Sequence, residues 1–168
     1  NLDSVYGFGL NIGPLFGLLP SGPVDFSDNA AGGLNAELTG INSYAYVNGA
    51  TASNNANMGF NLTLNALGGN ALAEIEQAAA NANGGNGLNL ELNGNGGVAS
   101  VWLDHVTTMG NGANGINVVE NFTGGAPAYV GGEYLISANN VGNGVRLVMS
   151  GLGGAPILDF GGGGDSDG

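Results

Sequence analysis

Apolar and polar residues alternate with a period of two in several short stretches of the chain. In residues 58–66 every second position is apolar, and the positions between them hold Gly, Asn and Thr. Residues 88–92 follow the same pattern, with three leucines separated by Asn89 and Glu91. This period is typical of half-buried β-strands. Weaker versions predict further strands at 34–47, 98–106, 116–123, 128–138, 145–150 and 156–160.

Asn-Gly pairs punctuate the chain between or beside these candidate strands. The sequence contains eight of them, from Asn48-Gly49 to Asn143-Gly144. Asn-Gly favours two-residue hairpin turns because both central positions require a positive φ. About eight strands separated by such turns predict a mainly all-β, antiparallel β-sandwich with a jelly-roll-like arrangement.

One segment departs from the strand pattern. Residues 70–82 are rich in Ala, Glu and Leu, and Asn70 stands where a helix N-cap would be. Leu72, Ile75 and Ala79 would share one face of a helix. The sequence therefore predicts one short helix near 70–82.

Similar six-residue fragments recur along the chain. GLNAEL begins at Gly33, GFNLTL at Gly59 and GLNLEL at Gly87. Their spacing is uneven and no fixed period links them, so we interpret them as one strand pattern used several times rather than as a solenoid repeat.

Charge is scarce and almost wholly negative. Charged residues make up 8% of the 168 residues, against about 25% in an ordinary domain. Arg146 is the one basic side chain against 13 acidic residues, which gives a formal net charge of -12. Nucleic acid is therefore not expected as a partner, because phosphate neutralisation needs clustered Lys and Arg. Association with an anionic membrane surface is disfavoured for the same reason.

The residue composition also predicts an extracellular location. Cysteine is absent and no apolar run reaches the length of about 18 residues that a membrane span requires. The chain begins at Asn1 with no basic segment before an apolar stretch, which is expected of a processed protein. We expect the protein at the cell surface or in the medium.

The N-terminal segment is the strongest candidate for an assembly element. In residues 1–22, Tyr6, Phe8, Leu10 and Ile12 would line one face of an extended strand that ends before a Pro-rich stretch. Such an arm can complete its own sheet or add to the sheet of a neighbouring copy. The expected organisation is this arm, a β-sandwich domain at 23–160 and a flexible Gly/Asp tail at 161–168.

Two kinds of modification or ligand site can be proposed from the residues. Asp25 and Asp28 lie in a loop whose oxygen atoms suit calcium, and no other cofactor is expected. Asn61 and Asn121 each begin an Asn-X-Thr triplet and are candidates for N-glycosylation.

No arrangement of residues predicts an enzyme. Asp104 and His105 are neighbours, and on a strand their side chains would point to opposite faces. Ser43, Ser100 and Ser137 lack the sequence context of a nucleophile elbow. A glycosidase pair drawn from the glutamates stays open as a minor alternative. These glutamates are Glu37, Glu74, Glu76, Glu91, Glu120 and Glu133.

Together these features favour a structural subunit. We expect a self-assembling extracellular filament or surface layer, a homopolymer whose subunits are joined by strand addition of the N-terminal segment. Low charge supports this, since edge strands are normally guarded by charged residues. One alternative is a monomeric cell-surface adhesin or binding module that recognises a surface glycan. Another is an envelope β-barrel pore, whose lipid-facing strands alternate in the same way.

Overall fold

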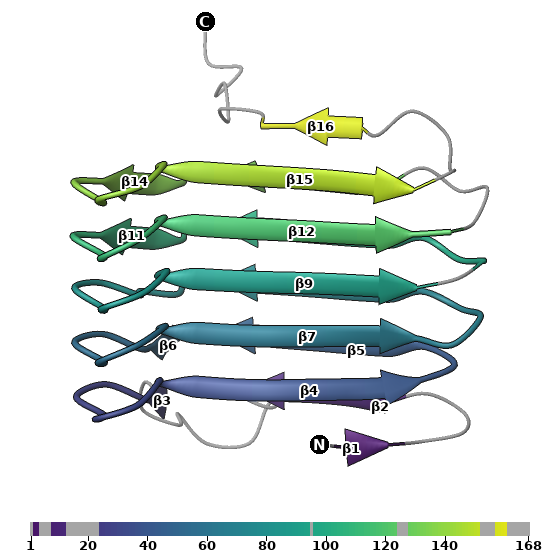
Figure 1. Ribbon diagram of the computed structural model, residues 1–168, viewed down its shortest axis with the longest axis horizontal. Coiled ribbons are helices and arrows are strands. Elements are labelled where there is room, and N and C mark those ends of the chain that lie inside the picture. The colour runs from purple at the N-terminus through teal and green to yellow at the C-terminus, as the bar shows by residue number, and fades with distance from the viewer. Residues whose placement is uncertain are drawn as a thin grey trace, which may run out of the picture.

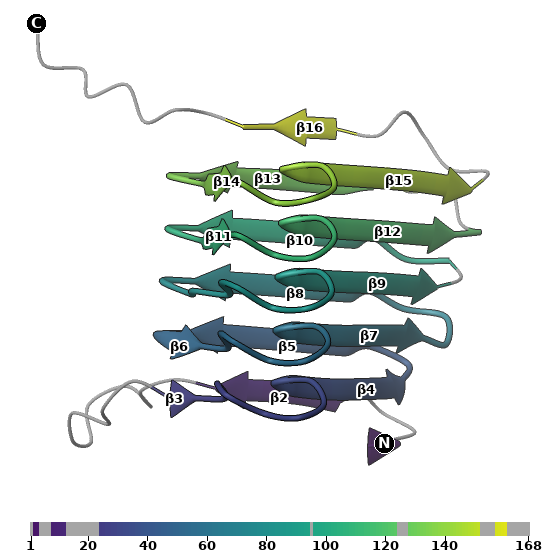
Figure 2. The same ribbon diagram turned by 60° about the vertical axis from the view of Figure 1, so that its left-hand side comes forward.

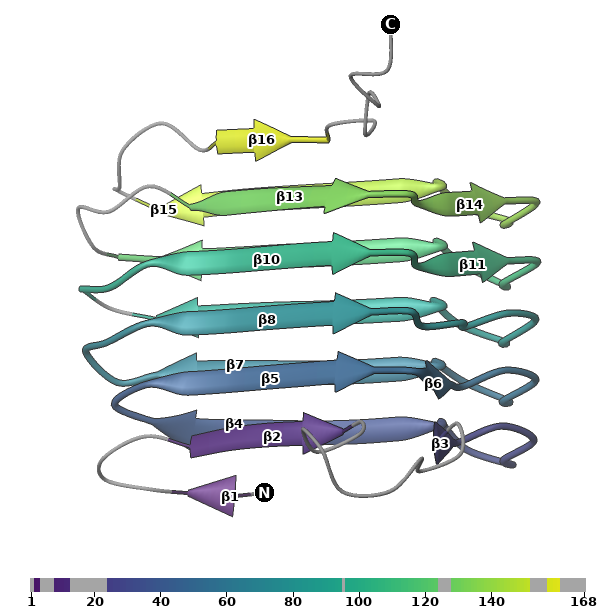
Figure 3. The same ribbon diagram turned by 180° about the vertical axis from the view of Figure 1, so that it is seen from behind.

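The protein is a β-solenoid of stacked turns (Figure 1). The computed structural model describes residues 2–3, 8–12, 24–94, 96–123, 128–151 and 157–160. Within these ranges there are strands but no helix, and two six-stranded sheets face each other. Two further two-stranded ladders lie beside them (Figures 1 and 3). Every pair of neighbouring strands is parallel.

Each turn of the solenoid contributes one strand to each large sheet. Sheet A contains β1 (Leu2–Asp3), β4 (Leu34–Gly40), β7 (Phe60–Ala66), β9 (Leu88–Gly94), β12 (Ile116–Phe122) and β15 (Val145–Gly151). Sheet B contains β2 (Phe8–Ile12), β5 (Ser43–Asn48), β8 (Ala71–Glu76), β10 (Ala99–Asp104), β13 (Tyr129–Glu133) and β16 (Ile157–Asp159). The short ladders pair β3 (Val24–Asp25) with β6 (Ala50–Thr51) and β11 (Thr107–Met109) with β14 (Ile136–Ala138).

The interpretation that the chain has no repeat is wrong. The fragments that follow Gly33, Gly59 and Gly87 are stacked in register as β4, β7 and β9. Contacts between successive turns of sheet A join residues 26, 28, 28 and 29 apart. The spacing is uneven because the connections between the strands vary in length, while the seven-residue strands themselves stay aligned.

The predicted antiparallel sandwich of about eight strands is also wrong. Asn-Gly pairs do not form hairpins here, because every connection carries the chain onward to a parallel strand. The chain leaves sheet B through one residue with a positive φ in each turn: Gly49, Gln77, His105 and Tyr134. A second set of equivalent residues, Asp28, Asn54, Ala82, Gly110 and Asn139, also has positive φ. Since these positions accept many residue types, the sequence does not reveal them as corners.

The segment predicted as a helix near 70–82 forms β8 and the corner after it. In β8 the buried and half-buried residues alternate, with Ala71, Ala73 and Ile75 inside the solenoid. β8 pairs with β5 and β10 along its full length. These two ladders outweigh the helix propensity of Ala, Leu and Glu, which is a weak preference in a tertiary context.

The core consists of inward-facing side chains stacked in rows along the solenoid axis. Sheet A supplies large residues, such as the row Leu38, Leu64 and Leu92, all 0% exposed. Sheet B supplies small ones, including Ala71, Ala73, Ala99 and Val101. Large residues on one sheet and small ones on the other fill the narrow space between the sheets.

A ladder of asparagines runs inside one corner. Asn29, Asn55, Asn83, Asn111 and Asn140 occupy equivalent positions, and each Nδ2 up to Asn111 donates to the Oδ1 of the next residue at 3.0 Å. The backbone N–H of each donates to the same oxygen. The Asn83 side chain also donates to the Ala52 carbonyl. Every turn is therefore joined to the next by these hydrogen bonds, and those made by Asn55 and Asn83 are fully buried.

A second asparagine ladder lies on the outer surface of sheet A. Asn61, Asn89 and Asn117 each donate to the preceding residue of the row, which starts at Asn35. Arg146 completes the row by donating to the Asn117 Oδ1 at 2.9 Å. Water can reach this row, since Asn89 is only half-buried.

The two ladders predict different losses in the free energy of unfolding for an Asn→Ala substitution. Asn83→Ala leaves the Asn55 donors and the Ala52 carbonyl without partners in a buried site, so we expect the free energy of unfolding to fall by about 3 kcal/mol. Asn89→Ala, at a site open to water, is the matched control and should cost less than about 1 kcal/mol. Urea denaturation followed by circular dichroism measures both. Equal losses would contradict a structural role specific to the inner ladder.

Candidate functional site

Sheet B, whose strands lie in front in Figure 3, carries several aromatic and acidic residues at its outward positions. We call this outward face of sheet B the aromatic–acidic face. It comprises the outward positions Tyr44, Tyr46, Asn48, Leu72, Glu74, Glu76, Ser100, Trp102, Asp104, Tyr129, Glu133 and Asp159.

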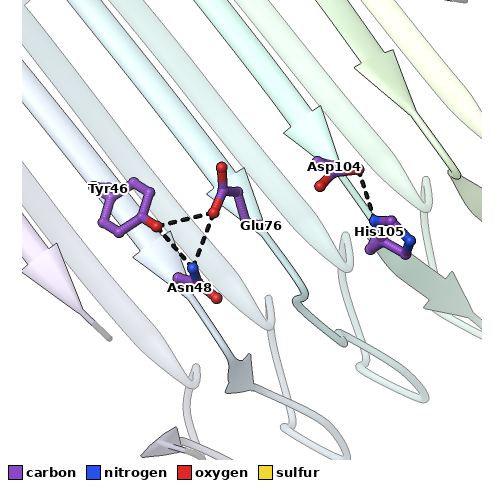
Figure 4. Close-up of polar contacts among 5 residues, drawn as sticks. All are labelled: Tyr46, Asn48, Glu76, Asp104 and His105. Carbon is purple, nitrogen blue, oxygen red and sulfur yellow. Dashed lines mark hydrogen bonds and ion pairs between the residues drawn. The ribbon is translucent and has the colours of Figure 1, made fainter. Parts of the chain in front are cut away.

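Hydrogen bonds between tyrosines and carboxylates join adjacent turns on this face. The Tyr44 hydroxyl donates to Glu74 at 3.2 Å and the Tyr46 hydroxyl to Glu76 at 2.9 Å. Asn48 Nδ2 donates to the Tyr46 oxygen at 2.7 Å and to Glu76 at 2.9 Å (Figure 4). The three groups form a closed triangle that fixes the Tyr46 side chain.

The electrostatics of the face keep these tyrosines neutral. Burial, followed by the negative charge of Glu74, raises the pKa of Tyr44 to about 12. The hydrogen bond from Asn48 lowers the pKa of Tyr46, but burial and the Glu76 carboxylate outweigh it and the net shift is upward. Both hydroxyls are therefore donors throughout the physiological pH range.

Trp102 occupies space that Gly131 leaves open on the neighbouring strand. A Cβ at Gly131 would lie 2.6 Å from Cζ3 of the Trp102 ring and 2.7 Å from the Tyr129 hydroxyl. The rings of Trp102 and Tyr129 are nearly parallel, with their centroids 6.4 Å apart and planes inclined by 13°. Glycine at this position thus allows two aromatic side chains to lie together on the sheet.

Asp104 and His105 contact each other, contrary to the prediction that they would point apart. His105 stands just after β10 with a φ of +50°, which turns its ring back toward the strand. Its Nδ1 lies 2.7 Å from Asp104 Oδ1 (Figure 4). The ring stacks on Tyr134 of the next turn with centroids 4.4 Å apart. The prediction failed because it treated His105 as part of the strand.

No lysine or arginine balances the negative charge on this face. Glu76, Asp104 and Glu133 are in register on adjacent strands. Arg146, the one basic side chain in the sequence, lies on sheet A and bonds to Asn117. Like charges aligned in this way repel each other and lower stability.

Of the predicted assembly residues, Phe8, Leu10 and Ile12 belong to β2, which pairs with β5 of the same chain. Leu10 and Ile12 are half-buried against the core. Tyr6 lies outside the described residues. Strand exchange between copies stays a prediction.

The predicted calcium residues are exposed. Asp25 Oδ1 accepts a hydrogen bond from the Ser27 backbone N–H at 2.9 Å, and Asp28 has a φ of +61°. Among the residues with described positions, no group of three or more His, Cys, Asp or Glu could hold a metal ion. Calcium binding at this loop remains an untested prediction.

Both predicted glycosylation sites form asparagine–asparagine hydrogen bonds between adjacent turns. Asn61 Nδ2 donates to Asn35, and Asn121 Nδ2 donates to Asn93. A sugar on either nitrogen would replace one of its two N–H donors.

The C-terminal end of the stack opens the interior to solvent, which sequence analysis missed. Val145 of β15 is 39% exposed, whereas Ile116, one turn below in the same inward row, is 0% exposed. Leu158 of β16 is 55% exposed, whereas its partner Val130 is 0% exposed. The row through Ile116 and the row through Val130 therefore both end in a solvent-exposed apolar side chain. Recognising the in-register repeat in the sequence would have predicted this exposed end, because the last repeat has no following repeat to cover it.

The described part of the chain contains no helix that is long and apolar enough to cross a membrane. Comparisons with protein-family models, with curated proteins and with solved structures found no match to this chain.

The packing of Trp102 on Gly131 predicts a spectroscopic change. Gly131→Ala places a methyl group against the Trp102 ring, so the ring must move toward solvent. Trp102 is the one tryptophan in the sequence, so a red shift of tryptophan fluorescence reports its displacement directly. Ser100→Ala, on the same strand and face, is the control and should leave the emission unchanged. An unshifted spectrum in Gly131→Ala would show that the two residues are not in contact.

Proposed function

We propose that this protein is a structural subunit whose solenoids stack end to end into an extracellular filament. The observation that carries the proposal is the open C-terminal end. The row that is buried at Phe60, Leu88 and Ile116 becomes exposed at Val145 of β15, and the row that is buried at Val130 becomes exposed at Leu158 of β16. Solenoids that stay monomeric normally cover such an end with a polar capping repeat.

Strand polarity supports stacking of the C-terminal end of one copy on the N-terminal end of the next. All strands in each sheet are parallel, so a copy added in the same orientation continues both sheets. The two ends lie at opposite ends of the solenoid axis, with β1 at one and β16 at the other (Figures 1 and 2). A contact between unlike ends does not close, and it produces a filament rather than a dimer.

The inner asparagine ladder has the same polarity. Each rung up to Asn111 donates toward the C-terminal end, where the ladder finishes at Asn140. Within the described part of the chain, the Asn140 backbone N–H has no acceptor and the Asn29 Oδ1 has no donor. Stacking unlike ends would bring a donor and an acceptor to the same corner and extend the ladder from copy to copy.

This arrangement differs from strand addition by residues 1–22. End-to-end stacking needs no exchange of segments, because β2 can stay in its own sheet while the edges of β15 and β16 pair with a neighbour. With a net charge of -12 on every copy, assembly should strengthen as salt screens the repulsion.

A charge placed at the open end should block assembly. Leu158→Asp and Val145→Asp put a carboxylate where an apolar contact is proposed, and neither site is buried in the single chain. We expect the wild type to form large species that grow with protein and salt concentration, and both variants to remain monomeric. Sedimentation velocity and negative-stain electron microscopy measure this.

The matched control is Leu67→Asp, because Leu67 is 65% exposed and follows β7 in the middle of the stack. It should assemble like the wild type. Wild-type protein that stays monomeric at high concentration and high salt would refute the proposed function.

The aromatic–acidic face favours a second candidate function, a surface module that binds a glycan. Tyr44, Trp102 and Tyr129 provide ring faces on a flat sheet, and Asn48 and Glu76 provide polar groups beside them. Aromatic surfaces with a few fixed polar groups are typical of ligand sites.

Removal of the Trp102 ring tests this second candidate. If the face binds a glycan, Trp102→Ala should weaken retention on an insoluble polysaccharide such as cellulose or chitin by about tenfold or more, which corresponds to about 1.4 kcal/mol. Asn35→Ala, on the opposite sheet, is the control and should bind as the wild type does. No retention of the wild type on either polymer would count against this candidate.

A further inference from the structure

One carboxyl group lies inside the solenoid in a row of apolar side chains. Glu120 of β12 continues the inward row formed by Leu38, Leu64 and Leu92, and Met149 of β15 follows it. Glu120 is 1% exposed. Neither of its carboxyl oxygens has a hydrogen-bond partner among the described residues.

No charged group compensates Glu120 from the strands packed around it. On β9 the ionisable side chain is Glu91, and on β15 it is Arg146, and both occupy outward positions of sheet A. Across the core, Asp104 of β10 and Glu133 of β13 are outward on sheet B. The residues in register with Glu120 on both neighbouring strands, Leu92 and Met149, are apolar.

The protonated and ionised forms of Glu120 therefore differ in their effect on the fold. Burial raises the pKa of Glu120 to about 7 from an ordinary value of 4.5. An acid whose pKa is raised in the folded state does not lower the free energy of unfolding at a pH below its unfolded pKa. As pH rises from 4.5 toward 7, the free energy of unfolding falls, and above pH 7 it falls no further on account of this group.

The position of Glu120 decides which part of the solenoid responds. On the C-terminal side, β15 is the last strand of sheet A, and its Ser150 hydroxyl donates to Asn121 Oδ1 of β12 at 2.7 Å. Separation of β15 from β12 would admit water to the carboxylate while β4, β7 and β9 stay paired. Terminal turns of a solenoid can open in this way because each repeat contacts only its neighbours.

We propose that Glu120 is a pH-dependent latch that holds the terminal turn closed when protonated and releases it when ionised. The inference rests on the proposed end-to-end assembly, since β15 provides part of the surface on which the next copy would stack. Filaments would then be most stable near pH 4.5 and below, and their terminal turns would open progressively more often as pH rises from 4.5 to about 7.

Hydrogen exchange tests the latch without requiring assembly. The full chain carrying Leu158→Asp serves as the monomeric background, and exchange of the β15 amides is compared with that of the β7 amides from pH 5 to pH 8.5. Glu120→Gln is measured in the same background at each pH. The ratio of the exchange rates of the two proteins then cancels the pH dependence of intrinsic amide exchange. Glu120→Leu is a second variant, because leucine occupies this row in β4, β7 and β9.

At pH 5 we expect the β15 amides to exchange only about four times faster with Glu120 in place than in Glu120→Gln, because the carboxyl group ionises only partly when the turn opens. Above neutrality they should exchange faster with Glu120 in place, because only that side chain ionises. The ratio of the two exchange rates should approach about two orders of magnitude, as a rise in the Glu120 pKa from 4.5 to about 7 implies. Glu91→Gln, which removes an outward carboxylate from β9, is the control and should leave the profile unchanged. Equal exchange with Glu120 and in Glu120→Gln at pH 8.5, or equal acceleration of β7, would overturn the latch.

Assembly of the chain without the Leu158→Asp change completes the test. Glu120→Leu should keep its filaments above pH 7.5, where the wild type disassembles. A wild type that never assembles would refute the proposed function, while the exchange data would still decide whether Glu120 controls the terminal turn.

Discussion

In-register parallel stacking is the constraint on which the rest of the structure depends. Because each strand lies directly on its equivalent in the next turn, every residue meets a residue at the same position of the repeat. Leucine on leucine buries apolar surface, and asparagine on asparagine pairs one donor with one acceptor. The inner ladder through Asn55, Asn83 and Asn111 satisfies its polar groups because they repeat.

The same constraint explains the unusual composition. A charged residue repeated at one position would face its own charge about 4.8 Å away, since that is the distance between neighbouring strands. Asn and Gly therefore take the places that Lys and Glu hold on other surfaces, and charged residues fall to 8%. On sheet A, Glu37 and Glu91 are separated by Thr63 in their row. The aligned Glu76, Asp104 and Glu133 on sheet B depart from this rule.

The sequence predicted local structure better than topology. The alternation predicted for residues 58–66 is confirmed from Phe60 onward by β7, and that of residues 88–92 by β9, and the leucines of both strands are all buried. The helix near 70–82 was wrong because ladder pairing on both sides outweighed local propensity. Parallel topology was missed because positive φ at Gln77, His105 and Tyr134 has no residue-type preference to reveal a corner. The Tyr46–Glu76 pair could be found only once the length of a turn was known.

A stack that satisfies its interior by repetition cannot satisfy its ends in the same way. The forces that bury Ile116 and Val130 at 0% exposure leave Val145 and Leu158 uncovered, and in the proposed assembly another copy covers them. Ordinary capping residues would remove such an affinity permanently. Under our proposal, a carboxyl group one turn below the end of sheet A would remove it conditionally, because a buried Glu120 without a hydrogen-bond partner is compatible with its apolar row only when it is neutral. In this proposal, cohesion and its control arise from separate rows of the same core, since Glu120 lies in the row that ends at Met149 and the exposed end residues are Val145 and Leu158.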